Sequence, residues 1–194
     1  MNKDLKDEYT LPFCSIEQVN ERRNRINLLQ EYNNIDAHDI DKKYYLKKEM
    51  FSNIGDETEI VIPFYASWGG KNISIGDNCY VNFNVTMLDD GKIVIGDNVL
   101  IGPNVTISTV SHPLDVEDRI KNLLIIKKVI IEDNVWIGAN SVILPGITIG
   151  ENSVIGAGSV VTKDIPANVV AFGNPCKIVR NLNWDKSCTY LTFI

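Results

Sequence analysis

Histidine is the side chain best suited to accept a proton near neutral pH, and this chain has two, His38 and His112. His112 lies in the segment SHP (111–113), directly before a stretch that interrupts a regular apolar repeat. A histidine at the base of such a loop is a candidate general base, because long loops in compact folds often carry function. The alternative is that His112 only caps a turn. We expect His38, in a segment predicted to be helical and away from any motif, to be structural or exposed.

Metal chemistry is not indicated by the cysteines. Cys14, Cys79, Cys176 and Cys188 show no CxxC spacing. This usage is typical of reduced thiols in a cytoplasmic protein and predicts no zinc site. We therefore expect chemistry that requires no metal.

The secondary structure that positions these residues is indicated by aliphatic side chains that recur every six residues. Aliphatic side chains recur at this spacing in three runs: Ile75, Val81 and Met87; Ile95, Ile101 and Ile107; and Ile131, Ile137, Ile143, Ile149, Ile155 and Val161. A period of six fits neither an amphipathic helix nor a long alternating strand. It predicts a parallel β-helix built from hexapeptide repeats, in which three hexads make one triangular turn.

Each hexad has a predicted corner three residues after its aliphatic residue. Most of these positions hold Asn, Asp or Gly, which tolerate left-handed backbone angles. Asp90 fits this corner rule, whereas Asn82 does not lie at a corner. The turn formed by residues 75–94 carries two extra residues near Asp89–Asp90, and the hexad 107–112 breaks the rule with Val110. We expect departures from the count to mark functional loops or ordinary surface insertions.

Composition and charge narrow the class of protein. The 194 residues suit one main domain with appendages, and 44% hydrophobic content is ordinary for a globular chain. The net charge of −6 argues against a nucleic-acid partner. The first ten residues lack the apolar region of a signal peptide, and no apolar run reaches the ~18 residues of a membrane span. We expect a cytoplasmic protein with no membrane partner.

The flanks of the coil are predicted to differ from it. Ser15 and Gln18 fit a capping box before a helix that ends near Tyr32, and a second helix is expected over about 39–51 with Ile40, Tyr44 and Phe51 inward. The predicted organisation is a helical N-terminal cap (1–56), the β-helix (57–180) with an external loop at about 113–128, and a C-terminal tail (181–194).

Several motifs resemble one known family. They are VNFNVTMLDD (81–90), IGDNVLIGPNVTIS (95–108), SHP (111–113), VWIGANSVILPGITIGENSVIGAGSVVTKDIP (135–166) and GNPCKIVR (173–180). This combination is similar to the maltose and galactoside O-acetyltransferases of the hexapeptide-repeat acyltransferase superfamily. The resemblance implies a left-handed parallel β-helix in a homotrimer, with active sites between subunits. It also implies acetyl transfer from acetyl-CoA to a small hydroxyl acceptor, a sugar or glycoside.

The resemblance also implies roles for particular residues. His112 matches the general base that takes the proton of the acceptor hydroxyl. Positions that contact or flank the acceptor are matched by Ser67, Asn82, Asp90 and Trp136. Positions along the CoA arm and its phosphates are matched by Ala139, Ala157, Thr162, Lys163, Lys177 and Arg180. Lys163, Lys177 and Arg180 form a basic cluster that would suit an anionic nucleotide, although each alone would more often be a solvated charge.

Two positions depart from the family pattern. Ala139 stands where the family often has Ser, so that a hydroxyl contact to the thioester is lost and a backbone N–H is left. The segment TLPFCS (10–15) has no carboxylate where the family supplies an Asp to the sugar, and Phe13 occupies that place. The identity of the acceptor is therefore open.

Other functions of the same fold remain as alternatives. One is a xenobiotic acetyltransferase of the streptogramin or chloramphenicol type, or an amino-sugar N-acetyltransferase. Another is a non-catalytic β-helix that only binds. A metal enzyme of the γ-carbonic-anhydrase type needs three histidines, which the coil does not offer.

Overall fold

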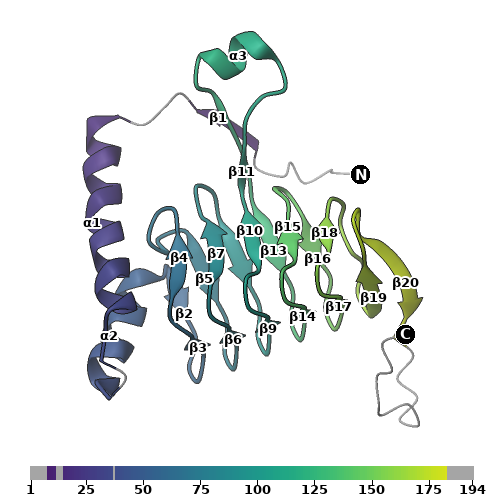
Figure 1. The fold of residues 1–194 in the computed structure, drawn as a ribbon, viewed down its shortest axis with the longest axis horizontal. Coiled ribbons are helices and arrows are strands. Elements are labelled where there is room, and N and C mark those ends of the chain that lie inside the picture. The colour runs from purple at the N-terminus through teal and green to yellow at the C-terminus, as the bar shows by residue number, and fades with distance from the viewer. Residues whose placement is uncertain (1–7, 12–14, 37, 183–194) are drawn as a thin grey trace, which may run out of the picture.

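In the computed structural model, which describes residues 8–11, 15–36 and 38–182, the chain folds as a parallel β-helix with two helices at its N-terminal end (Figure 1). This confirms the fold class that the count of six predicts. The strands of successive turns stack along one axis, and β20 lies at the opposite end from the helices.

Three sheets form the sides of the coil. The first sheet contains β2 (Asn53–Ile54), β5 (Ile73–Ile75), β8 (Ile93–Ile95), β13 (Val129–Ile131) and β16 (Thr148–Ile149). The second contains β3 (Glu59–Ile60), β6 (Tyr80–Val81), β9 (Leu100–Ile101), β14 (Trp136–Ile137), β17 (Val154–Ile155), β19 (Val169–Phe172) and β20 (Lys177–Asn181). The third contains β4 (Phe64–Ala66), β7 (Val85–Leu88), β10 (Thr106–Ser108), β15 (Val142–Ile143) and β18 (Val160–Val161).

The core is a set of aliphatic columns inside the coil. Ile75 is the parallel partner of Ile95, and Ile131 is the partner of both Ile95 and Ile149. All four side chains are buried. Burying each one contributes about 1.5–3 kcal/mol, so the hexad pattern defines the coil by placing one such residue on every side of every turn.

The sheets meet at three edges, which we name by their residues. The asparagine edge joins the first sheet to the second through corners at Asn78, Asn98, Asn134, Asn152 and Asn168, all with positive φ. The groove edge joins the second sheet to the third and carries the corners Asn84, Asn104, Asn140 and Gly158. The loop edge joins the third sheet to the first. Here Asp90 lies in a turn and Asp164 holds the equivalent position of a later hexad, but neither is among the described residues with positive φ, whereas Gly146 at this edge has a φ of 85°.

The hexad that carries Val110 leaves the coil at the loop edge. Strand β11 (Val110–Ser111) pairs antiparallel with β12 (Leu124–Lys127), and α3 (Val116–Ile120) forms the tip of the hairpin that projects from the body in Figure 1. A further strand, β1 (Glu8–Leu11), pairs with β12 on its other side. The irregular hexad therefore marks the start of an external loop, and the coil resumes at β13.

Two helices, α1 (Ile16–Asn33) and α2 (Ile40–Met50), cover the first turn of the coil. The predicted capping box of Ser15 and Gln18 is present. The predicted inward face of α2 is wrong for Ile40 and Tyr44, which are 75% and 56% exposed. Leu46 and Met50 are buried in their place.

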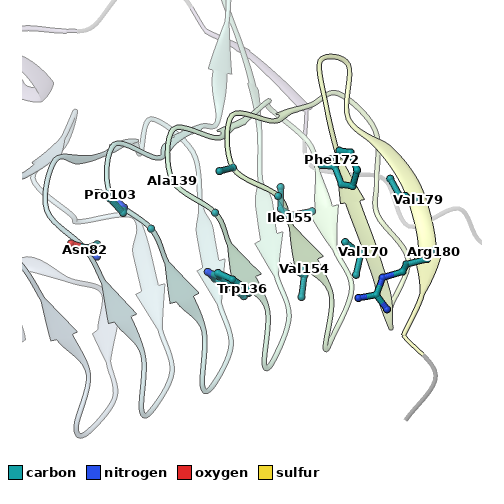
Figure 2. Close-up of a pocket in the computed structure, with 14 residues that line it drawn as sticks. Asn82, Pro103, Trp136, Ala139, Val154, Ile155, Val170, Phe172, Val179 and Arg180 are labelled. Carbon is teal, nitrogen blue, oxygen red and sulfur yellow. The ribbon is translucent and has the colours of Figure 1, made fainter. Parts of the chain in front are cut away.

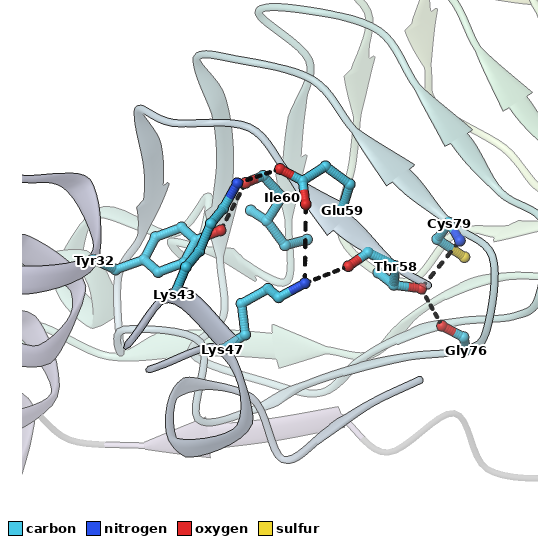
Figure 3. A network of polar contacts seen from close by, with 8 residues as sticks. All are labelled: Tyr32, Lys43, Lys47, Thr58, Glu59, Ile60, Gly76 and Cys79. Atoms are coloured by element: carbon cyan, nitrogen blue, oxygen red, sulfur yellow. Dashed lines mark hydrogen bonds and ion pairs between the residues drawn. The ribbon is translucent and has the colours of Figure 1, made fainter. Parts of the chain in front are cut away.

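Polar contacts also join the cap to the coil (Figure 3). The Tyr32 hydroxyl donates to the Ile60 carbonyl at 2.6 Å, and Lys47 Nζ donates to the Thr58 carbonyl at 2.7 Å. Lys43 forms an ion pair with Glu59. Burial lowers the pKa of Lys47 and raises that of Tyr32. The cap is thus held by a buried and a half-buried donor on coil carbonyls as well as by apolar packing.

Among the described residues, no helix is long and apolar enough to cross a membrane, and no group of three metal-ligating side chains occurs. Cys79 and Cys176 are free thiols. Two expectations fall outside the described residues: Phe13 in the place of the family's Asp, and the course of the tail after residue 182.

Candidate active site

A groove of about 890 Å³ runs along the groove edge and the adjoining face of the second sheet (Figure 2). Trp136, Val154 and Val170 lie on the outward face of β14, β17 and β19 and form its floor. The complete lining is Asn82, Gly102, Pro103, Trp136, Gly138, Ala139, Val154, Ile155, Gly156, Ala157, Val170, Phe172, Val179 and Arg180.

Glycines at the corners shape the groove wall. A Cβ added at Gly138 would lie 2.5 Å from the backbone nitrogen of Ala157 on the next turn. A Cβ at Gly102 would likewise lie 2.7 Å from the nitrogen of Ala139. Only glycine lets successive turns stack this closely. The result is a wall of backbone and small side chains along which an extended ligand can lie.

The groove is apolar in its middle and polar at its ends. Figure 2 shows Asn82 at one end and Arg180 at the other. Asn82 follows β6 and Arg180 lies on β20, five strand spacings away along the second sheet, which corresponds to about 24 Å at the usual spacing. This geometry suits a long molecule with an anionic group near Arg180 and a polar reacting end near Asn82.

The loop edge carries a second set of predicted site residues. Ser67 Oγ donates a hydrogen bond to Asp90 Oδ2 at 2.9 Å, although the two residues belong to successive turns. The backbone N–H of Gly91 donates to Thr109 Oγ1 at 2.8 Å, and Thr109 Oγ1 donates to the Leu88 carbonyl at 2.6 Å. The turn that holds Asp90 is therefore tied to the base of the loop that carries the exposed His112.

One member of this cluster has no predicted role. The Asp89 side chain is fully buried and accepts hydrogen bonds from the backbone N–H groups of Trp68 (2.6 Å) and Asn72 (3.3 Å). Burial raises the pKa of the Asp89 carboxyl, while these hydrogen bonds oppose that rise. The sequence signal that points to Asp89 is the pair of extra residues in its turn.

The predicted site residues fall on two separate edges of one chain. Five of them line the groove: Asn82, Trp136, Ala139, Ala157 and Arg180. Five lie on the loop edge: Ser67, Asp90, His112, Thr162 and Lys163. Lys177 lies exposed on β20 and does not line the groove.

The third sheet separates the two edges. Asn82 precedes β7 and Asp90 follows it. A strand of this length spans about 13 Å at the usual rise per residue. A single chain therefore does not gather all the predicted residues around one point.

Some groove residues were not predicted from sequence. Val154, Val170 and Val179 are outward-facing strand residues, and Phe172 lies at the end of β19. Val154 directly precedes a core aliphatic residue of its hexad, a position that alternation in a strand places on the outer face. The residue directly before the core aliphatic residue of a hexad is therefore a candidate lining residue that the sequence could have indicated.

Comparisons with known proteins agree on the fold and chemistry class. The family model described as the hexapeptide repeat of succinyl-transferase matches residues 92–118 and 128–163. Over 170 residues, which are 88% of this chain and 82% of that protein, the sequence is 48% identical to a galactoside O-acetyltransferase of Lactococcus lactis subsp. lactis.

Two solved structures are also similar. A galactoside acetyltransferase in complex with coenzyme A matches with a TM-score of 0.88 and 45% identity, over 94% of this chain and 90% of that one. A hexapeptide-repeat acetyltransferase of Vibrio cholerae O1 biovar eltor, complexed with acetyl coenzyme A, matches with a TM-score of 0.83 and 41% identity, over 88% and 91%.

Proposed function

The chain belongs to the maltose and galactoside O-acetyltransferase family of hexapeptide-repeat acetyltransferases, and we propose that its acceptor is a hydroxyl of a sugar or glycoside. The co-substrate is acetyl-CoA, which relatives of this fold bind as CoA or acetyl-CoA. The acceptor proposal rests on the similarity to galactoside O-acetyltransferases. The observation that supports the co-substrate is the groove, whose length, apolar floor and Arg180 at one end suit acetyl-CoA.

In the proposed binding mode, the CoA arm lies along the groove edge with its anionic end toward Arg180. Trp136 and Val154 would pack against the arm, and Ala139 and Ala157 leave room for it. Lys177 would contact CoA from outside the lining, whereas Thr162 and Lys163, which lie on the loop edge, would reach it from a neighbouring subunit. The acetyl group would then lie toward Asn82.

In the proposed reaction, the His112 imidazole takes the proton of the acceptor hydroxyl as its oxygen attacks the thioester carbonyl. The C–O bond forms, and the carbonyl π electrons move to the oxygen of a tetrahedral intermediate. The backbone N–H of Ala139 stabilises this oxyanion. Collapse breaks the C–S bond, and the imidazolium returns the proton to the CoA thiolate. The products are the acetyl ester and CoA.

The acceptor is proposed to bind beside Ser67 and Asp90 of one subunit and Asn82 of the neighbouring subunit. The Ser67 hydroxyl and Asp90 carboxylate already contact each other, so they form one polar surface on the loop edge. A polyol needs such fixed partners to direct one hydroxyl toward the base.

We further propose that the complete site forms between subunits of a homotrimer. The groove edge and the loop edge of one chain lie on opposite sides of the third sheet. In an assembly with cyclic symmetry, the groove edge of one subunit faces a different edge of its neighbour. His112 of one subunit would then serve the acetyl-CoA bound at the groove of the next. The free thiols of Cys79 and Cys176 agree with the proposed cytoplasmic location.

A thiol-release assay with acetyl-CoA tests the acceptor class. The panel contains methyl β-D-galactopyranoside, maltose, glucosamine, a nucleoside, chloramphenicol and a streptogramin. The proposal expects turnover of a neutral sugar through oxygen. Preference for the antibiotics or for the amine of glucosamine would favour the xenobiotic or amino-sugar alternatives. No turnover with any acceptor, together with retained CoA binding, would favour a binding protein.

A further inference from the structure

Trp68 lies between the proposed acceptor surface and helix α1, and no role in the reaction follows from the family motifs for it. It belongs to the segment Ser67–Asn72, which joins β4 to β5 at the loop edge. The side chain is half-buried. Its indole, its backbone and its ring face each make a distinct contact.

The indole N–H holds one side of the Asp90 carboxylate. Trp68 Nε1 donates to Asp90 Oδ1 at 3.2 Å, while Ser67 Oγ donates to Asp90 Oδ2 at 2.9 Å. The χ2 torsion of an aspartate is broad, so its own rotamer preference does not fix the plane of the carboxylate. Ser67 Oγ also lies 3.2 Å from Asp89 Oδ1, so its single proton is shared between the two aspartates. The Trp68 indole N–H is therefore the donor that is committed to Asp90, and together the two contacts fix the plane of the carboxylate. Each oxygen keeps a further lone pair for a ligand hydroxyl.

The backbone of Trp68 is fixed as well. Its N–H donates to the buried carboxylate of Asp89 at 2.6 Å, and Asn72 Nδ2 donates to the Asp89 carbonyl at 2.7 Å. The segment therefore wraps around Asp89. The hydrogen bonds to Asp89 therefore fix the backbone position from which the Trp68 side chain extends.

Helix α1 holds the ring from outside. The Arg22 guanidinium lies 5.9 Å from the centroid of the Trp68 ring, and Lys71 Nζ lies at the same distance. Arg22 Nε also donates to the Ser67 carbonyl at 2.8 Å. Lys71 is ion-paired with Glu21 of the same helix. Cations over an indole ring stabilise its position.

We propose that Trp68 is a positioning residue for the acceptor: it aligns the Asp90 carboxylate through its indole N–H and transmits the placement of helix α1 to the acceptor surface. This inference rests on the proposed role of Asp90 in binding the acceptor. The inference extends the role of Asp90, because the affinity for the acceptor then also depends on Trp68, a residue that does not have to contact the sugar.

Trp68→Phe tests the inference, since it keeps an aromatic ring under the two cations and removes the N–H donor together with one ring of the indole. With methyl β-D-galactopyranoside and maltose as acceptors, the KM for the sugar should rise about tenfold to 150-fold, the range for losing a hydrogen bond to a charged group. The KM for acetyl-CoA and the melting temperature should stay near those of the wild type. Tyr65→Phe, on the outward and exposed face of β4, is the matched control and should change neither KM.

A double-mutant cycle with Asp90→Ala separates this inference from the proposed function, because alanine leaves no acceptor for the indole N–H. If Trp68 acts through Asp90, Trp68→Phe has little further effect on the sugar KM once Asp90 is Ala. If Asp90→Ala raises the sugar KM and the effect of Trp68→Phe is absent or fully additive, the inference is overturned and the role of Asp90 stands. If Asp90→Ala leaves the sugar KM unchanged, or neither sugar is acetylated, the proposed acceptor surface fails and the inference falls with it.

Arg22 provides a graded arm of the same experiment. Arg22→Met removes the cation from the ring and the donor from the Ser67 carbonyl, whereas Arg22→Lys keeps the cation. The sugar KM should rise several-fold in the first variant and be partly restored in the second. Equal effects in both would overturn the part of the inference that involves the ring.

Discussion

The three edges of the coil are built from the same hexads, yet their polar side chains serve different purposes. Those on the asparagine edge hold successive turns together, whereas those on the other two edges are available for a ligand. On the asparagine edge, side-chain amides bond to one another from turn to turn. Asn98 donates to Asn134 at 3.1 Å, Asn134 to Asn152 at 2.9 Å, and Asn152 to Asn168 at 3.0 Å. A polar group whose donors and acceptors are used along the coil has little capacity left for a ligand.

Carboxylates on the asparagine edge follow the same rule. Asp97 Oδ1 accepts from the backbone N–H of Asp77 at 2.8 Å, and Asp133 Oδ1 accepts from that of Asp97 at 2.9 Å. On the groove edge, Phe83, Pro103, Ala139 and Ala157 take the place of these aspartates, although three of its corners are still asparagines. The loop edge is interrupted by insertions. The comparison indicates that regular repetition marks the structural edge and that departures from it mark the binding edges.

The largest expected effect belongs to the loop edge. His112→Ala should lower acetyl transfer by about 10²–10⁴-fold, the usual range for losing a general base, because nothing else would take the acceptor proton. The turnover number from thiol release measures it, and calorimetry should show that CoA still binds. His38→Ala, at the exposed start of α2, is the control and should be fully active. Turnover near normal in His112→Ala would remove His112 from the mechanism.

A smaller effect is expected at the far end of the groove edge. Arg180→Ala should weaken CoA binding about fivefold to thirtyfold, because it removes charge-assisted contacts with an anionic ligand. Lys177→Ala should weaken it less, since Lys177 does not line the groove. Calorimetric titration of CoA into each variant measures the difference. Unchanged affinity in the double variant would show that this end of the groove does not hold the nucleotide.

The asparagine edge should show an effect on stability alone. Asn134 has φ of 59° and two ladder contacts, so Asn134→Ala should lower the free energy of unfolding by about 1–3 kcal/mol. Asn134→Gly tolerates this φ and should lose less. Denaturant unfolding measures both variants, and their KM values should match those of the wild type. A changed KM for acetyl-CoA or for the sugar would contradict the assignment of this edge as structural.

The sequence predicts the coil better than the cap. The aliphatic count of six specifies which side chains are buried, because each one faces inward on its own strand whatever the rest of the chain does. The inward face of α2 depends on how the helix docks on the first turn. Ile40 and Tyr44 fit a helical periodicity, but Leu46 and Met50 are the residues that meet the coil.

The sequence predicts which residues belong to the candidate site, but it does not predict how they are arranged in space. Motifs indicate His112, Asn82 and Asp90 individually. Strand β7 separates Asn82 from Asp90, and this places the predicted residues on two different edges of the coil. The hexad spacing alone does not reveal that a complete site would need both edges. The contact of Trp68 with Asp90 crosses from one turn to the next through a segment of irregular length. Such contacts lie outside any local pattern.

The central claim is that a complete site takes the loop edge from one subunit and the groove edge from another. Two impaired variants test it directly: His112→Ala on the loop edge, and Asn82→Ala on the groove edge, which should cost about 10²-fold through lost positioning. Each is first assayed alone, and the two are then co-expressed with different tags, purified as mixed oligomers and assayed by thiol release.

In a trimer that contains both variants, one of the three sites between subunits has both edges intact, so the purified mixed preparation should recover about a third of wild-type activity. Activity that stays at the level of the separate variants, in oligomers shown by both tags to be mixed, would place the whole site within one chain and contradict the account.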